Sequence, residues 1–165
     1  MQDDQAGWQF FFSMLFVGLV ALCLGVLVRL GELPTSIAFF DAALIALATF
    51  RLTRLFVYDR ITRWMRDLTV DKEVVSEAPL SSVTIRQPVI AGPRRALHEL
   101  VTCPWCFGVW AALLTSFAYF ATPYAWYPIF VLAIAGVASV LQVGANLLGW
   151  YAEGRKHEVE AGERS

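Results

Sequence analysis

Two cysteines, Cys103 and Cys106, are the residues of this sequence whose type and spacing come closest to a chemical site. They flank Pro104 and Trp105 in the stretch CPWC, and the residues that follow are almost all apolar. The order predicts Cys103 as the N-cap and Pro104 as the first residue of a helix, where the missing proline N–H costs nothing. Unpaired N–H groups and the positive end of the helix dipole favour a thiolate in this first turn.

Three interpretations of the cysteine pair follow. A Cys-x-x-Cys pair that opens a helix can be a redox dithiol, although no βαβ pattern surrounds it here and the cytoplasm is reducing. With His98 it supplies three metal ligands, whereas a closed structural zinc site needs four. We favour a structural interpretation without a cofactor, in which the thiols pack as small apolar groups, Trp105 and Trp110 anchor the interface, and Gly108 admits a neighbouring helix. Zinc or another metal stays the alternative.

A second group of polar residues lies in the last apolar segment, where Ser139, Gln142 and Asn146 recur on one helical face. Polar groups in hydrocarbon normally face the interior of a bundle, so interhelical hydrogen bonding is favoured over a polar path for a solute. Gly136 and Gly144 thin the helix nearby.

Arg51 and Arg54 form another stripe, with Tyr58, near the end of the second apolar segment. Such arginines usually snorkel or contact anionic headgroups. Gln142 and Asn146 are expected at a compatible depth, which makes them the candidate partners for any further role of these arginines.

The elements that must position these residues are apolar helices. Hydrophobic residues make up 58% of the 165 residues and charged residues 16%, and the mean hydropathy is +0.57. At 1.5 Å per residue, the first apolar run spans about 34 Å, against a hydrocarbon core of about 30 Å. Asp3 and Asp4 precede this run without any Lys or Arg, unlike a signal peptide, so the run is expected to be a permanent helix.

We predict an all-α, polytopic membrane protein with a single membrane domain over residues 8–151. The expected order is a tail at 1–7, spans at about 8–30, 36–58, 104–122 and 128–151, a cytoplasmic loop at about 59–103, and a charged, frayed tail at 152–165. The second span continues as an amphipathic extension, either as one long helix or as a span joined to an interfacial helix.

Within the cytoplasmic loop, residues 69–93 show no clear period and are expected to be irregular, with a short extended piece at SSVTIRQPV as the alternative. Residues 94–102 are expected to form a short amphipathic helix that leads to the cysteines.

The distribution of Lys and Arg predicts the orientation. The turns at 31–36 and 123–128 carry none, so both termini are expected in the cytoplasm of a cell membrane. Arg29 and Asp41 are expected close together at the outer face, and the cysteine pair close to Arg51 and Arg54. The tail carries Arg155, Lys156 and Arg164. The cytoplasmic loop carries seven basic residues: Arg60, Arg63, Arg66, Lys72, Arg86, Arg94 and Arg95.

The stretches ATFRLTRLFVYDRITRWMRD (48–67) and LVTCPWCFGVWAA (100–112) resemble a family of small bacterial and phage membrane proteins, domain of unknown function 1360, over roughly residues 40–148. The resemblance implies an integral membrane protein without an established activity, in which the first span is added to a three-helix core. Some relatives are tied by name to sporulation or to phage. The matching positions are Arg51, Arg54, Asp59, Cys103, Cys106, Gly108 and Trp110.

The predicted function is therefore a non-enzymatic membrane protein that acts by assembly with itself or with another membrane protein in the lipid bilayer. The net charge of −1 indicates no nucleic-acid partner. Two alternatives stay open: a membrane thiol oxidoreductase or metal-binding protein that uses the CPWC pair, and a holin-like, lysis-associated protein.

Overall fold

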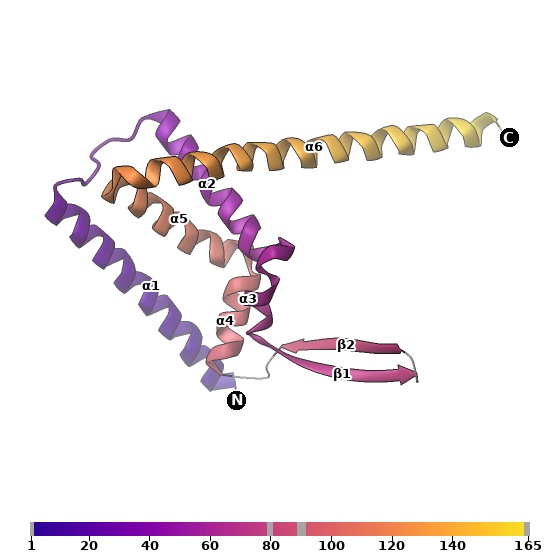
Figure 1. Cartoon of the computed structure of the whole chain (residues 1–165), viewed down its shortest axis with the longest axis horizontal. Helices are drawn as coiled ribbons and strands as arrows, with labels where there is room; N and C mark the ends of the chain where they lie inside the picture. The colour runs from indigo at the N-terminus through magenta and orange to yellow at the C-terminus, as the bar shows by residue number, and fades with distance from the viewer. Residues whose placement is uncertain (1, 79–80, 89–91, 164–165) are drawn as a thin grey trace.

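Four longer helices make up most of the protein, and a two-stranded hairpin projects from one end of them (Figure 1). The computed structural model describes the backbone of residues 2–78, 81–88 and 92–163 and the side chains of residues 5–71 and 92–156. The elements, in chain order, are α1 (Gln2–Leu30), α2 (Phe39–Val57), η1 (Arg60–Thr62), α3 (Arg63–Asp67), β1 (Val70–Ala78), β2 (Ser81–Pro88), α4 (Pro93–Thr102), α5 (Pro104–Ala121), η2 (Pro123–Ala125) and α6 (Trp126–Glu163).

The packed centre of the molecule lies where α2 crosses α6. Ala48 of α2 is fully buried against Ile129 and Ala133 of α6. A Cβ atom added to Gly136 would lie 2.6 Å from the carbonyl oxygen of Leu47, a distance that side chains do not adopt. The two backbones are therefore in direct contact, as small residues allow between helices in membranes.

α5 packs against the other side of α2 and runs in the opposite direction (Figure 1). The rings of Phe56 and Phe107 lie 5.3 Å apart. Gly108 faces Thr53, as its predicted role in close helix approach requires, but a Cβ there would lie 3.7 Å from the threonine Oγ1. That is an ordinary van der Waals distance, so this contact also has room for an alanine.

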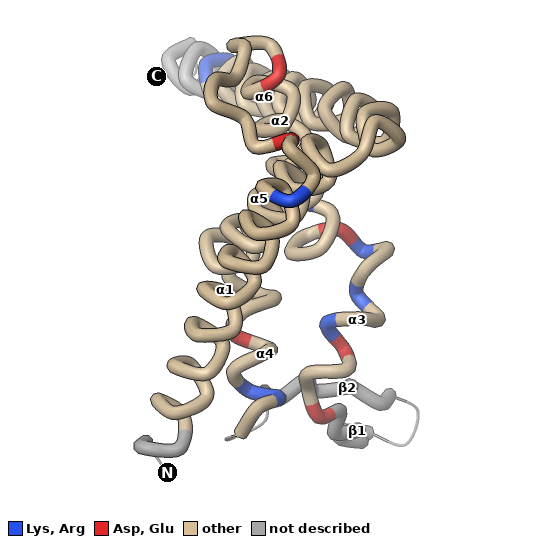
Figure 2. Tube along the Cα trace, turned by 90° about the vertical axis from the view of Figure 1, so that its left-hand side faces the viewer, with Lys and Arg blue, Asp and Glu red and all other residues tan. Residues whose placement is uncertain are grey.

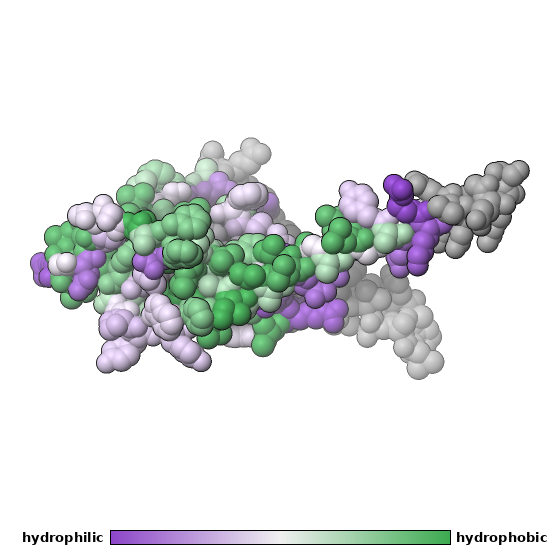
Figure 3. Space-filling model, turned by 90° about the horizontal axis from the view of Figure 1, so that it is seen from above, coloured by the Kyte–Doolittle hydropathy of each residue, from purple (hydrophilic) through white to green (hydrophobic). Residues whose placement is uncertain are grey.

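Within the part of the chain that the structure describes, three helices are long and apolar enough to cross a membrane, over Gln5–Leu30, Pro104–Ala121 and Pro123–Lys156. Only 11%, 11% and 17% of their apolar windows are buried within the chain. Seen from above, the apolar surface extends along α6 until it becomes hydrophilic toward the C-terminal part of the helix (Figure 3). The all-α membrane class is thus supported. α2 is not among the three, since it carries Asp41, Arg51 and Arg54.

The prediction of an irregular segment at residues 69–93 is wrong over most of that range, because β1 and β2 pair there as an antiparallel hairpin. Val75 lies opposite Val83, and the register shifts between Ser76 and Ala78. The alternative of an extended piece at SSVTIRQPV is correct for residues 81–88. Its partner strand was missed because acidic and basic residues interrupt the valines of VDKEVV. Residues 79–80 and 89–91 of the predicted loop lie outside the described residues.

α2 ends at Val57, so the alternative of one long helix is wrong. The hydroxyl of Thr62 donates to the carbonyls of Leu55 and Phe56. The guanidinium of Arg66 donates to the carbonyl of Phe56 and, at 2.9 Å, to that of Asp59. These donors satisfy carbonyls that the end of a helix leaves without partners. The chain then turns through η1 into the short α3.

The prediction of a frayed tail at residues 152–165 is also wrong for most of these residues, since α6 continues as one helix to Glu163. No proline follows Pro128, and the Ala, Glu, Lys and Arg residues of the tail are good helix formers. The side chains beyond residue 156, including that of Arg164, lie outside the described residues, as do those of Lys72 and Arg86.

Arg29 and Asp41 do not form the predicted contact. Among the described side chains, no ion pair joins them, and Asp41 instead accepts a hydrogen bond from Tyr119 of α5. The connection between α1 and α2 turns at Gly31, which has a φ of +72°, and runs without helix to residue 38. It is thus long enough to let the two helix ends separate.

Candidate functional site

The CPWC stretch forms the junction between α4 and α5. Cys103 separates the two helices in an extended conformation (φ −89°, ψ 111°), and its Sγ accepts a hydrogen bond of 3.3 Å from the backbone N–H of Cys106. It is therefore the N-cap of α5, and Pro104 is the first residue of that helix. Trp105 is 85% exposed and points away from the chain.

The two thiols are hydrogen-bonded to each other. All three cysteines of the chain are free. The pKa of Cys103 is lowered, chiefly by a hydrogen bond from the Cys106 thiol and then by the backbone N–H groups of Cys106 and Trp105. The helix end thus favours the thiolate on Cys103, as N-terminal helix positions generally do, and the contribution comes from the pair itself rather than from an arginine.

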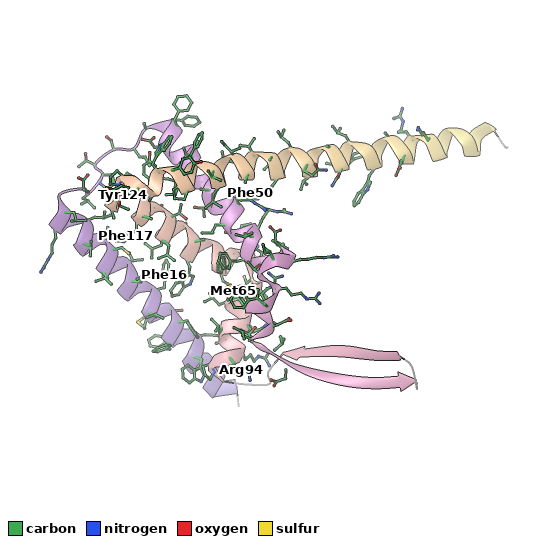
Figure 4. All side chains as sticks on the ribbon, in the orientation of Figure 1. Phe16, Phe50, Met65, Arg94, Phe117 and Tyr124 are labelled. Atoms are coloured by element: carbon green, nitrogen blue, oxygen red, sulfur yellow. The ribbon has the colours of Figure 1, made fainter. Side chains whose placement is uncertain are left out.

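Both cysteines open into a cavity of about 650 Å³ between α1, α4 and α5. Its walls are mainly apolar, and the rings of Phe16 and Trp110 meet across it at 5.2 Å. Figure 4 shows Phe16 and Phe117 in the space between α1 and α5. Trp110 therefore packs against α1, and its role as an interface anchor stays a prediction.

Glu99 forms the polar edge of this cavity. Its carboxylate accepts hydrogen bonds from Gln9 at 3.2 Å and Gln5 at 3.5 Å, both on α1, and pairs with Arg95 at 3.0 Å. The hydrogen bond from Arg95 is the largest cause that lowers the pKa of Glu99, with a further contribution from Gln9 and partial opposition from burial. These contacts hold the beginning of α1 to α4.

His98 does not join the cysteines. Its Nδ1 lies 2.8 Å from the Thr69 hydroxyl, which in turn donates to the carbonyl of Arg66. Among the side chains that the structure describes, no group of three or more His, Cys, Asp or Glu residues could hold a metal ion. The set of Cys103, Cys106 and His98 is therefore not assembled within one described chain.

The arginine and amide stripes do come together. Arg51, Arg54, Ser139, Gln142 and Asn146 line a second cavity of about 480 Å³ between α2 and α6. Charged residues gather along the connection from α2 through α3 and at the start of α4, whereas α1 and α5 carry few (Figure 2).

The two arginines have different partners. The guanidinium of Arg51 pairs with Asp59 at 2.9 Å. That of Arg54 lies over the rings of Phe50 and Tyr58, at 5.8 and 5.5 Å. The cavity with the cysteines and the cavity with the arginines share no lining residue. The helices that carry the two motifs are in contact, through Phe56 and Phe107, but the thiols and the guanidinium groups open into different cavities.

Long apolar helices with charged connections define the class as α-helical membrane proteins by length and composition. The chain belongs to the family described as "Protein of unknown function (DUF1360)", whose model matches residues 44–145. The match contains both motifs and leaves α1 outside.

Two proteins of Bacillus subtilis (strain 168) are similar to the chain. The UPF0713 protein YngL is 30% identical over 112 residues, which are 67% of this chain and 82% of that protein. The sporulation protein YjcA is 36% identical over 101 residues, which are 60% of this chain and 85% of that protein. No solved structure matches the chain.

Three contributing residues were missed by sequence reasoning: Gln9, Arg66 and Glu99. Arg66 was counted only as a cytoplasmic charge, although its spacing from the end of α2 allows it to cap that helix. Gln9 and Glu99 are 90 residues apart in sequence, and no local pattern relates them.

Proposed function

We propose that the protein is a non-enzymatic, multi-pass protein of the cell membrane that acts by assembling with itself or with another membrane protein. The observation that carries this proposal is the large apolar helix surface that the chain leaves uncovered. On α6, Leu141 and Leu148 are 68% and 71% exposed. Lipid covers some of this surface, and a second helix can pack against the rest, as helices do in bilayers.

We further propose four spans, formed by α1, α2, α5 and α6, with both termini in the cytoplasm. The directions of three helices support this arrangement, because α1 and α5 run toward one end of the molecule and α2 runs back from it (Figure 1). The charges of α2 are also partnered within the protein: Arg51 with Asp59, Arg54 with two rings, and Asp41 with Tyr119. Partnered charges lower the cost of placing this helix in hydrocarbon.

Reporter fusions after residues 33, 80, 125 and 165 test this topology. We expect them to report outside, inside, outside and inside, in that order. An external signal after residue 80 would contradict the proposal, and an internal signal after residue 33 would show that α1 does not cross.

A photoreactive residue in place of Leu148 tests the assembly. We expect crosslinks from Leu148 to a second protein molecule in native membranes, and two differently tagged copies should co-purify if that molecule is the same protein. The matched control is Ala133, which is 6% exposed against α2 and should crosslink only within the chain. A Leu148 variant that yields only monomer in native membranes contradicts assembly through this face.

The second candidate function is dithiol–disulfide exchange at the cysteine pair. It is favoured by two free, hydrogen-bonded thiols that open into one cavity. Because the pKa of Cys103 is lowered, its alkylation should stay fast at a pH where a free cysteine has become slow. In a complementation or partner-capture assay at matched abundance, Cys103→Ser and Cys106→Ala should keep activity if the pair only packs and caps. Loss of activity in both would favour thiol chemistry over our first proposal.

A further inference from the structure

The cavity between α2 and α6 has the composition of an anion site. It is lined by two guanidinium groups, one hydroxyl and two amides, and its remaining walls are Ala135, Ala138 and Val143. None of the described side chains that line it is acidic. Asp59 reaches it only indirectly, through its ion pair with Arg51.

The charge of the cavity is positive because only one of its two arginines, Arg51, is paired with a carboxylate. The 2.9 Å pair with Asp59 compensates the charge of Arg51. Arg54 has no ion pair among the described side chains, and its guanidinium lies over the rings of Phe50 and Tyr58. An aromatic pair orients a guanidinium without consuming its N–H donors. Arg54 can therefore still donate to an acceptor in the cavity.

The polar groups of α6 complete the donor set. The hydroxyl of Ser139 donates to the carbonyl of Ala135, and the side-chain amide of Gln142 donates to the Asn146 oxygen at 3.2 Å. This second bond leaves the amide N–H groups of Asn146 available and fixes them one turn beyond Gln142. A ligand for this cavity thus needs negative charge and several acceptor oxygens, which are the properties of a phosphate group.

The apolar walls of the cavity favour a phosphate that is attached to an apolar group over a free phosphate. On α6 the apolar walls of the cavity are Ala135, Ala138 and Val143. A ligand held at Arg54 would therefore contact these side chains and, with α2 and α6 crossing the bilayer, lie beside lipid. The volume of about 480 Å³ is within the usual range for small-ligand sites.

We propose that this cavity binds the headgroup phosphate of an anionic phospholipid. Arg54 is the main contact, Arg51 is a second donor positioned by Asp59, and Asn146 contributes its amide. The acyl chains extend past Ala135, Ala138 and Val143 into the surrounding bilayer. The proposal rests on α2 and α6 crossing the bilayer with these residues at one headgroup layer.

Native mass spectrometry of the full-length protein tests the site. The protein is released from vesicles of phosphatidylcholine mixed with phosphatidylglycerol, and the retained lipids are counted. We expect phosphatidylglycerol to be enriched on the protein, and Arg54→Gln to reduce the enrichment roughly tenfold, as the loss of a charge-assisted hydrogen bond predicts. Arg54→Lys, which keeps the charge without the planar fork, should recover part of it.

The matched control is Arg63→Gln, which removes an exposed arginine outside the cavity and should retain the enrichment. Equal losses in Arg54→Gln and Arg63→Gln would overturn the site in favour of general surface attraction, and unchanged enrichment in Arg54→Gln would overturn it outright. Inorganic phosphate that displaces phosphatidylglycerol at equal concentration would overturn the lipid as the ligand. The reporter fusions report topology independently, so a failed lipid site and failed spans are distinguishable.

Discussion

The contact between α2 and α6 and the contact between α1 and α5 are built in opposite ways. At the first, backbone meets backbone, because Gly136 lies directly against the carbonyl of Leu47 and Ala48 is fully buried. At the second, the rings of Phe16 and Trp110 meet across a cavity of about 650 Å³, and the hydrogen bonds of α1 go to Glu99 of α4 rather than to α5. The closely packed contact lies within the segment that the family model matches, and α1 lies outside it.

This difference in packing indicates which part of the molecule is rigid. Close packing fixes helix positions because many atoms would have to move together. A contact through side-chain ends over a cavity leaves fewer atoms to displace. We therefore infer that α2, α5 and α6 form one structural unit, to which α1 is docked. The following predictions test this contrast, beginning with the largest effect.

Gly136→Leu should separate α2 from α6. A Cβ at this position meets backbone that cannot rotate away, so we expect a loss of about 3 kcal/mol or more in the free energy of unfolding, at or above the upper end for overpacked cores. The measurement is thermal unfolding in detergent. Gly144→Leu is the control, because no atom lies within 4 Å of a Cβ at that glycine. Equal shifts in both variants would mean that the effect is one of helix propensity and not of packing.

Arg66→Met should loosen the end of α2. The substitution keeps most of the side-chain bulk and removes the donors to the carbonyls of Phe56 and Asp59. We expect a cost of about 1–3 kcal/mol in unfolding free energy, since carbonyls are left without partners. Arg63→Met, at an exposed position of α3, which also contains Arg66, should reduce the free energy of unfolding much less. If both cost the same, Arg66 acts through net charge and not as a cap.

Phe16→Ala should weaken the docking of α1 alone. The loss of the ring contact with Trp110 is expected to cost about 0.5–1.5 kcal/mol beyond the change in buried area. Protease cleavage in the connection over residues 31–38 should become faster, while the unfolding of the α2–α5–α6 unit stays unchanged. Phe10→Ala, at a ring that is 65% exposed, serves as the control. Cooperative destabilisation of the whole protein by Phe16→Ala would refute the division into unit and docked helix.

Acid should release the polar contact of α1, and this effect should be the smallest. The pKa of Glu99 is lowered from 4.5, so its contribution to docking is complete above that pH and is lost as the pH falls through the lower, folded value. Cleavage of the connection over residues 31–38 should therefore stay constant from neutral pH to about 4.5 and rise only below it. Glu99→Gln should remove this pH dependence. A rise that begins well above 4.5 would point to a different titrating group.

The apolar helices were predictable because their signal is local. Runs of apolar residues predict helices at 8–30, 104–122 and 128–151 from length alone, and the proline after Cys103 marks the start of α5. The end of α2 and the β1–β2 hairpin were not predictable in the same way. Both depend on groups that meet only after the chain has turned: the Arg66 side chain and the carbonyl of Phe56 in the first case, and the paired backbones of β1 and β2 in the second.

The sequence by itself determined that the protein is helical, that it carries membrane-length apolar segments, and that a cysteine pair caps one helix while two arginines lie near the end of another. Only the tertiary structure decided what these groups face. The thiols open toward α1 and α4, and the arginines open toward Gln142 and Asn146 of α6. The reason is that the period of a helix defines its faces, whereas the neighbour of each face depends on backbone contacts such as that of Gly136 with Leu47, between residues 89 positions apart in the chain.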